Sequence, residues 1–268
     1  MFRRDGFLLI ENVSTPAELA SLRVVYDRLF SEHRGWDNGD LFDMVGSDNR
    51  NTGLALPQLL WPSRYESTLR QTLLHSNAVS IASQLLGPKA QNVLEHAILK
   101  PPRVGAATPW HQDDAFIRRG CGFVEQISIW FPLQDVTVEN GCLLYIRGSN
   151  HGRLMTHQSP HNDPRIHGLE TVKPPDPTHC VAVEMSAGSA VIHHSRTLHS
   201  AGVNTSLEPR RAYILGYSVQ TQPNQLLSAD FPWNLEKRTA RAHRELQSMH
   251  PLKRTLLRCR RLLRGQKF

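Results

Sequence analysis

Residues 126–150 read QISIWFPLQDVTVENGCLLYIRGSN, two short apolar runs separated by the turn residues Glu139-Asn140-Gly141. Runs of this length, rich in Ile, Trp and Phe and bounded by Gly and Asn, are typical of strands. Many such strands without helices between them favour a β-sandwich or jelly roll over a βαβ sheet. The runs with this pattern are 96–100, 126–133, 142–146, 181–185, 190–193 and 212–219.

Helical signals are concentrated before residue 90. Thr15-Pro16-Ala17-Glu18 has the form of a capping box with proline at the first helical position. Ser63-Arg64-Tyr65-Glu66 repeats the capping pattern, and Gly87-Pro88 is a stop signal. The predicted helices are 16–32, a second that opens at 63–66 with Leu69 and Leu73 facing inward, and a third near 78–86.

This order of elements predicts an α+β, mainly β fold in a single domain over 1–233. A jelly-roll core of about 90–220 is expected to be buttressed by helices from about 14–88, and a basic, helical tail is expected over 234–268. Two long polar connections resist assignment to the sheet and are expected to be lids or binding loops. These connections are 40–60 and 147–179. The apolar segment near the amino end is predicted to be a first strand.

Composition is that of an ordinary globular protein, with 268 residues, 40% of them hydrophobic and 21% charged. No apolar run approaches the roughly 20 residues that cross a bilayer. The four cysteines lie far apart and form no C-x-x-C pair, which argues against a disulfide framework or a structural zinc site. Reduced thiols and a cytoplasmic location are therefore expected.

The net charge of +7 is unevenly distributed. From Lys237 to the end there are eleven Lys or Arg and one acid, Glu245, so this part carries +10 and the other 236 residues carry −3. The tail is expected to be a solvated helix that can touch an acidic surface. Nucleic-acid binding is not expected, because the basic residues are not interleaved with aromatic ones. The oligomeric state is not predicted.

The sharpest short motif is Trp110-His111-Gln112-Asp113. On an extended segment, residues two apart project to the same side, so His111 and Asp113 can reach one metal ion while Gln112 faces away. One imidazole and one carboxylate are two thirds of the facial set that holds non-haem Fe(II) and leaves positions open. The next residue, Asp114, is expected to point elsewhere.

A second histidine must come from a later strand, and His193, His194 and His199 are the candidates. His199 is followed eleven residues later by Arg210, which can lie beside it on the next antiparallel strand and clamp the distal carboxylate of an oxoacid. A supporting role at a strand end is the simpler interpretation of His193 and His194. The scattered loop histidines 151, 157, 161 and 167 are expected to be solvated rather than a second metal site.

From about Asp5 to Val219 the sequence resembles the phytanoyl-CoA dioxygenase family of Fe(II)/2-oxoglutarate oxygenases. Several ordered matches over two hundred residues are far more specific than any single motif. The matching segments are Asp5-Gly6-Phe7, Lys100-Pro101-Pro102, the 108–113 stretch TPWHQD, Trp130 with its strand, the 134–143 stretch QDVTVENGCL, and Arg147-Gly148-Ser149-Asn150-His151.

The resemblance implies a double-stranded β-helix of the cupin-like kind. It implies His111, Asp113 and His199 as iron ligands and Arg210 as the ligand of the 2-oxoglutarate carboxylate, with O2 as the second cosubstrate. It further implies positions near the cosubstrate at Gln112, Trp130 and His96. The implied activity is hydroxylation of an unactivated C–H bond of a small organic or lipid-like substrate, with decarboxylation of 2-oxoglutarate to succinate and CO2.

The sequence departs from the family pattern at two positions. Ala201 replaces a serine that often helps to hold the cosubstrate, and Arg147 replaces a usual proline. Asp113 itself favours hydroxylation over halogenation, because halogenating relatives carry Gly or Ala there. Two alternatives remain, a change of reaction to desaturation, epimerisation or ring formation at the same site, and a catalytically silent jelly-roll binding module. The substrate is not identified, although Arg103, Arg118, Arg119 and Arg147 would suit an acidic one.

Overall fold

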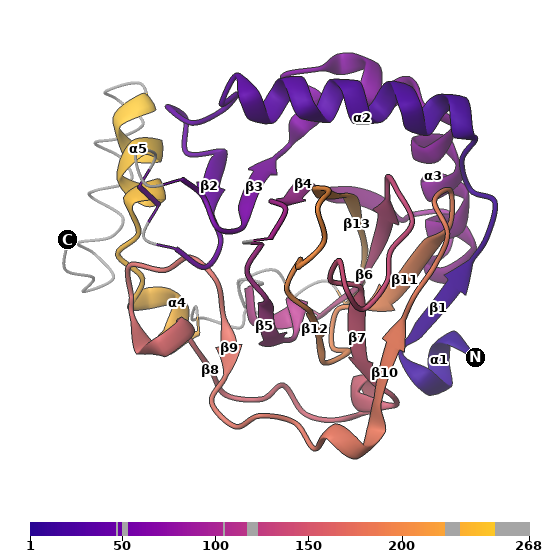
Figure 1. Ribbon diagram of the computed structural model, residues 1–268. Coiled ribbons are helices and arrows are strands. Elements are labelled where there is room, and N and C mark those ends of the chain that lie inside the picture. Colours follow the sequence, from indigo (N-terminus) through magenta and orange to yellow (C-terminus); the bar gives the residue numbers. More distant parts are fainter. Residues whose placement is uncertain (47, 50–52, 104, 117–122, 223–230, 250–268) are drawn as a thin grey trace.

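The computed structural model describes residues 1–46, 48–49, 53–103, 105–116, 123–222 and 231–249. These residues form mostly antiparallel β-structure, with a seven-stranded sheet of order β1-β11-β6-β13-β4-β3-β2 and a four-stranded sheet of order β10-β7-β12-β5 (Figure 1). Strands β8 and β9 form a separate two-stranded sheet, and β9 contacts β5. The strands are β1 (Phe7–Ile10), β2 (Leu41–Asp43), β3 (Pro57–Leu60), β4 (Gln91–Lys100), β5 (Thr108–His111), β6 (Phe123–Pro132), β7 (Leu143–Ile146), β8 (His157–Gln158), β9 (Glu170–Thr171), β10 (Cys180–Val183), β11 (Ala190–His194), β12 (His199–Ala201) and β13 (Arg210–Gln222).

Alternation along β6 separates the core from the site. Ile127, Ile129 and Phe131 are buried in one apolar cluster together with residues of the helices, whereas Ser128 and Trp130 point to the opposite face. That second face lies opposite the four-stranded sheet and lines a cavity between the two sheets. The period of two therefore gives one strand both a core face and a site face.

Two α-helices cover the outer face of the large sheet. Helix α2 (Pro16–Ser31) begins where the sequence predicts, with the Thr15 hydroxyl accepting a hydrogen bond from the Glu18 N–H at 3.2 Å. Helix α3 (Leu73–Leu86) ends at Gly87. The two helices pack in one cluster with β6, β11 and β13, and Figure 1 shows α2 running along one edge of the ribbon view above the sheet.

The second predicted helix is wrong in form. Instead of one α-helix, the chain makes two short 3-10 turns, η2 (Pro62–Arg64) and η3 (Ser67–Gln71), before α3. Glu66 and Thr72 both adopt extended backbone angles and cap the turns that follow them, so the helix restarts twice. Leu69 is buried as expected, but Leu73 is 47% exposed as the first residue of α3.

The stretch 40–60 is not only a loop, because β2 and β3 in it extend the large sheet beyond β4. The turn between them is organised by the buried Asp43, whose carboxylate accepts hydrogen bonds from the backbone N–H groups of Val45, Ala55 and Leu56 at 2.8–3.2 Å. A carboxylate that accepts hydrogen bonds from three backbone amides can stabilise a turn whose sequence has no apolar pattern. No period-two pattern is visible here, since the strands have only three and four residues.

At the amino end a single helical turn, α1 (Phe2–Asp5), precedes the predicted strand β1, which pairs with β11. The other long polar connection, 147–179, contains the β8-β9 pair and three 3-10 turns: η6 (Ser149–His151), η7 (Pro160–Asn162) and η8 (Pro177–His179). No helix among the described residues is long and apolar enough to cross a membrane.

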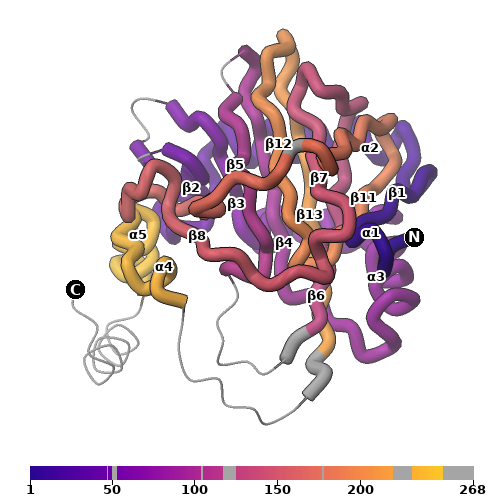
Figure 2. Tube along the Cα trace, turned by 90° about the horizontal axis from the view of Figure 1, so that it is seen from below, coloured from indigo at the N-terminus to yellow at the C-terminus, as the bar shows by residue number. Residues whose placement is uncertain are grey.

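The segment 231–249 packs back onto the domain. It contains α4 (Pro232–Leu235) and α5 (Ala240–Ser248), which lie beside β2 and β8 in both ribbon and tube views (Figures 1 and 2). Arg244 fixes α5 through an ion pair to Asp48 at 2.7 Å and hydrogen bonds to the carbonyls of Trp36 and Leu41 at 2.9 and 3.0 Å. The remainder of the predicted basic, helical tail, residues 250–268, lies outside the described residues.

Gly141 allows β7 to pair with β12, the strand that carries His199. Its φ is +84°, and an added Cβ atom would lie 2.5 Å from the carbonyl oxygen of Gly202 and 3.0 Å from that of Val203. Both contacts are to backbone, which cannot rotate away as a side chain would. Residue 141 must therefore be glycine for conformational and for steric reasons.

We expect Gly141→Ala to lower the free energy of unfolding by about 2–5 kcal/mol, because it adds a backbone clash to the cost of a left-handed alanine. Gly148→Ala is the matched control, since Gly148 also has a left-handed backbone (φ +77°, ψ 0°) but no atom closer than 3.8 Å to an added Cβ. It should cost only about 1–2 kcal/mol. Denaturant unfolding of the two variants measures the difference, and equal losses would contradict the steric account.

Candidate metal centre

The pairing of β12 with β5 brings the three predicted ligands together. His199 lies opposite His111 in the strand register, and Asp113 opens the short 3-10 turn η4 (Asp113–Phe116) just after β5. The Nε2 atoms of both histidines lie 3.7 Å from Oδ1 of Asp113, and the three ligand atoms all lie within 4.8 Å of one another. Asp113 reaches the site from a turn, not from the extended strand that the spacing argument assumed.

Backbone carbonyls fix the orientation of both imidazoles. Nδ1 of His111 lies 2.8 Å from the carbonyl oxygen of Pro109, and Nδ1 of His199 lies 2.9 Å from that of Thr197. An Nδ1–H donated to a carbonyl leaves Nε2 unprotonated and directed at the site, which is the form that binds a metal. Burial lowers the pKa of His111 and lowers that of His199 well below the usual value, so both rings are held neutral.

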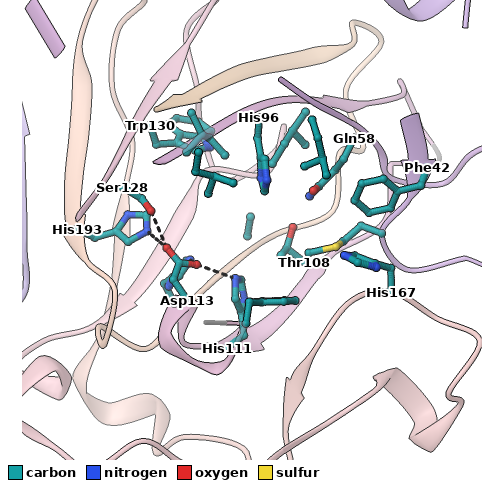
Figure 3. A pocket seen from close by; sticks show the side chains of 18 of the residues that line it. Phe42, Gln58, His96, Thr108, His111, Asp113, Ser128, Trp130, His167 and His193 are labelled. Carbon is teal, nitrogen blue, oxygen red and sulfur yellow. Dashed lines mark hydrogen bonds and ion pairs between the residues drawn. The ribbon is translucent and has the colours of Figure 1, made fainter. Parts of the chain in front are cut away.

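Asp113 is held as a carboxylate by neighbours on the large sheet. Burial opposes its ionisation, but hydrogen bonding, chiefly from His193, outweighs this and keeps the pKa of Asp113 far below its usual range. Ser128 donates to Oδ2 at 2.7 Å, and Nε2 of His193 lies 3.2 Å from the same oxygen (Figure 3). The Tyr145 hydroxyl lies 2.9 Å from Nδ1 of His193 and extends this hydrogen-bond network. Oδ1 is left to face the two histidines.

The residues around the set behave as expected in two cases. His193 supports Asp113 and does not join the three ligand atoms, which agrees with the supporting role predicted for it. Asp114 turns away and pairs with Arg196 at 3.1 Å. Ser128 was missed by the sequence analysis, although a serine two residues before Trp130 in an otherwise apolar strand is a signal of a site-facing position.

Arg210 is a buried cation with no ion-pair partner among the described residues. It begins β13, is 2% exposed, and lines the same cavity as the His-Asp-His set. Its Nε and Nη1 atoms have no hydrogen-bond partner among the described residues, and its guanidinium lies over the Trp130 ring at 5.3 Å. Burial lowers the pKa of Arg210 to about 9. A buried guanidinium with unmet donors fits an anionic ligand with planar oxygens, such as a carboxylate.

Of the other three predicted cosubstrate residues, two line the cavity and one does not. Trp130 and His96 line the cavity, and burial lowers the pKa of His96 to about 4 (Figure 3). Gln112 does not line it. Its side-chain amide donates to the carbonyl of Arg196 at 2.8 Å and accepts from the N–H of Met155 at 2.8 Å, so it ties the metal-binding turn to two loops.

The cavity has a volume of about 520 Å³, which is sufficient for a cosubstrate and a small molecule together. One end holds the His-Asp-His set and Arg210. Figure 3 shows that the other end is formed by Phe42, Gln58 and His167, far from His193. Lys237 and Arg241 from the C-terminal segment also line the cavity, so the predicted domain boundary at residue 233 falls within its wall.

Expectations about the loop histidines and arginines are only partly met. The prediction that the loop histidines are solvated is wrong for two of them: His157 is buried and accepts a hydrogen bond from the Gln112 N–H at 3.2 Å, and His167 lines the cavity. His151 and His161 are exposed as predicted. Arg147 pairs with Asp5 at 3.2 Å, and neither it nor Arg103 lines the cavity. Arg118 and Arg119 lie outside the described residues.

Comparison with known proteins agrees with this geometry. The family model for phytanoyl-CoA dioxygenase (PhyH) matches residues 2–212. The crystal structure of EvdO2 from Micromonospora carbonacea var. aurantiaca, complexed with 2-oxoglutarate, is 35% identical, with a TM-score of 0.71 over 87% of this chain and 93% of that chain. The L-proline trans-4-hydroxylase of Streptomyces griseoviridis is 32% identical over 157 residues, 52% of this chain and 59% of the hydroxylase.

A third relative covers more of this chain than the hydroxylase does, at lower identity. The phytanoyl-CoA dioxygenase domain-containing protein 1 homolog of Caenorhabditis briggsae is 23% identical over 80% of this chain and 87% of its own length. The family match spans well over half of the chain and includes all three residues of the His-Asp-His set and Arg210. The chain therefore belongs to the phytanoyl-CoA dioxygenase family, and it is a non-haem iron, 2-oxoglutarate-dependent dioxygenase.

Proposed function

We propose that this chain hydroxylates an unactivated C–H bond of a small organic or lipid-like molecule. In the overall reaction R–H, 2-oxoglutarate and O2 become R–OH, succinate and CO2. The observation that carries the proposal is the presence, in one cavity, of a His-Asp-His group and a buried arginine whose donors are unmet. Both features favour a ligand of the complementary charge, since a buried charge is stabilised by a partner.

His111, Asp113 and His199 would hold Fe(II), and Arg210 would bind the distal carboxylate of 2-oxoglutarate. Bound Fe(II) supplies the centre at which O2 is reduced and the C–H bond is oxidised. The chain's own contribution is orientation. Carbonyls of Pro109 and Thr197 fix the imidazoles, Ser128 and His193 fix one carboxylate oxygen, and Trp130 supports the arginine.

Part of the cavity wall is apolar. Apolar side chains from both sheets and from η4 line the cavity beside the metal set, where they would contact an apolar substrate and limit the access of water. These wall residues are Leu60, Ile98, Phe116, Leu143 and Ile214. Ala201 also lines the wall, so the hydroxyl that relatives often offer to the cosubstrate is absent here.

Proteins that share this fold are described as catalysing other reactions. A structure described as the epimerase SnoN has a TM-score of 0.65 at 20% identity, which shows the shared fold alone. Product mass separates the alternatives, because hydroxylation adds one oxygen atom, desaturation or ring closure removes two hydrogens, and epimerisation leaves the mass unchanged. The intact carboxylate at Asp113 supports hydroxylation over halogenation, as argued from the sequence.

Two further expectations stay predictions. The widely spaced cysteines support a reducing compartment such as the cytoplasm, and Cys142 and Cys180 are free thiols. The contact of the tail with an acidic surface depends largely on residues after 249, which lie outside the described part of the chain.

We expect Asp113→Ala to reduce succinate formation from 2-oxoglutarate at least about 100-fold, because it removes one of three metal ligands, a larger change than loss of a ligand's hydrogen-bond partner. Asp114→Asn is the matched control, since the adjacent carboxylate pairs with Arg196 outside the ligand set. The Fe(II) affinity and succinate yield of Asp114→Asn should stay within a few-fold of wild type. Near-normal turnover in Asp113→Ala would show that the ligand assignment is wrong.

Arg210→Gln should raise the KM for 2-oxoglutarate by about 10- to 150-fold, since a charge-assisted hydrogen bond contributes about 1.5–3 kcal/mol. The neighbouring Arg211 serves as control, because its guanidinium pairs with Asp27 at 2.7 and 2.9 Å on the surface. Arg211→Gln should leave the KM unchanged. Steady-state kinetics with varied 2-oxoglutarate gives both values, and a reversed pattern would move the carboxylate clamp to Arg211.

A further inference from the structure

The outer end of the cavity receives two cationic side chains from a segment beyond the family match. Lys237 and Arg241 line the cavity, whereas the matched region ends at residue 212. The segment reaches the cavity because Trp233 and Asn234 both donate to the carbonyl of Ala115, at 3.0 and 2.9 Å. These cations are thus a feature of this chain's own C-terminal part.

The ammonium group of Lys237 is already hydrogen-bonded to backbone carbonyls of the domain. Its ammonium donates to the carbonyl of Ile166 at 3.2 Å, to that of Gly168 at 2.6 Å, and to that of His167. These three bonds use all three ammonium donors. Burial lowers the pKa of Lys237 to about 7. Lys237 therefore holds the loop that carries His167 and has no donor left for a ligand.

Arg241 is different, because most of its donors are free. Nε donates to the carbonyl of Gly39 at 2.7 Å, and the guanidinium lies 4.9 Å from the centre of the Phe42 ring. Among the described residues, neither Nη group has a hydrogen-bond partner, and no carboxylate lies within 4 Å of them. The position is built into the fold, since a Cβ on Gly39 would lie 2.8 Å from the Arg241 carbonyl oxygen.

The acidic residues near Arg241 do not neutralise it by contact. Asp40 accepts from the Tyr65 hydroxyl at 2.8 Å, and Asp48 pairs with Arg244 at 2.7 Å. Glu245, one helical turn along α5, makes no ion pair with Arg241 in the described part of the chain. These acids act on Arg241 only through longer-range attraction.

Between Arg241 and the metal set, the wall is mostly apolar. Phe42 and Met44 belong to one buried cluster that also contains Ile98, while Gln58 and His96 add neutral polar groups. Asp113 is the one carboxylate among the described residues that line the cavity. If Asp113 binds the metal and Arg210 the cosubstrate, no carboxylate of the described cavity wall remains to pair with Arg241.

We propose that Arg241 binds the acidic group of the substrate, a carboxylate or a phosphate ester carried on an apolar body. The inference rests on the proposed function, because it places the body of that molecule between Arg241 and the metal set. The guanidinium would offer its two Nη groups as a fork to the acid, and the Phe42 ring would hold it flat. The C-terminal segment would then act in substrate selection.

Calorimetric titration with simple probes tests this proposal. The protein is loaded with Zn(II) and 2-oxoglutarate, so that the metal set and Arg210 are filled, and is titrated with octyl phosphate, octanoate and octanol. We expect at least one of the two acids to bind about tenfold or more tightly than octanol. Arg241→Gln should remove this preference and leave the affinity for octanol unchanged. Which acid binds better identifies the acidic group.

Two control variants separate charge from folding. Arg238→Gln changes the same charge in the same segment at an exposed position that does not line this cavity, and it should bind all probes as wild type does. Arg241→Lys keeps the charge and should retain a preference for the acid. Equal binding of acids and octanol, no binding of either acid, or an unchanged preference in Arg241→Gln would each overturn the proposal. Loss of Zn(II) or 2-oxoglutarate binding by wild type would instead count against the proposed function.

Discussion

The antiparallel pairing of β12 with β5 is the constraint on which the rest of the molecule depends. It sets His199 opposite His111, although 88 positions separate them along the chain. A shift of one residue would turn one imidazole to the other face of the sheet, because side chains alternate along a strand. The neighbouring pairing of β12 with β7 and the glycine turn at 141 fix this register from the other side.

The two sheets contribute groups of different charge to the site. The small sheet and the turn after it present neutral imidazoles and one carboxylate, and the large sheet presents a cation and the hydrogen-bond donors that hold the carboxylate. Burying Asp113 and Arg210 costs free energy that no contact between them repays, since neither is paired with the other. The site is therefore complete only with an ion and an anion bound, which ties stability in this region to ligand binding.

Much of this could be predicted from the sequence, because local patterns carry it. The H-x-D motif, the strand runs and the capping box at Thr15 are short-range signals, and the family resemblance selects His199 and Arg210. Strands β2 and β3 could not be predicted, since Asp43 organises their turn through backbone contacts that leave no periodic pattern. Arg241 could not be predicted as a cavity residue either. Its placement depends on contacts with Gly39 and Phe42, some two hundred positions away, and a basic tail sequence looks the same whether it is solvated or docked.

A crystal structure grown without O2, with Fe(II) and 2-oxoglutarate present, tests the central claim most directly. The account predicts one metal ion about 2.0–2.2 Å from both Nε2 atoms and from a carboxylate oxygen of Asp113. It also predicts the distal carboxylate of the oxoacid on the guanidinium of Arg210. A metal bound elsewhere, or an oxoacid whose distal carboxylate lies away from Arg210, would contradict it.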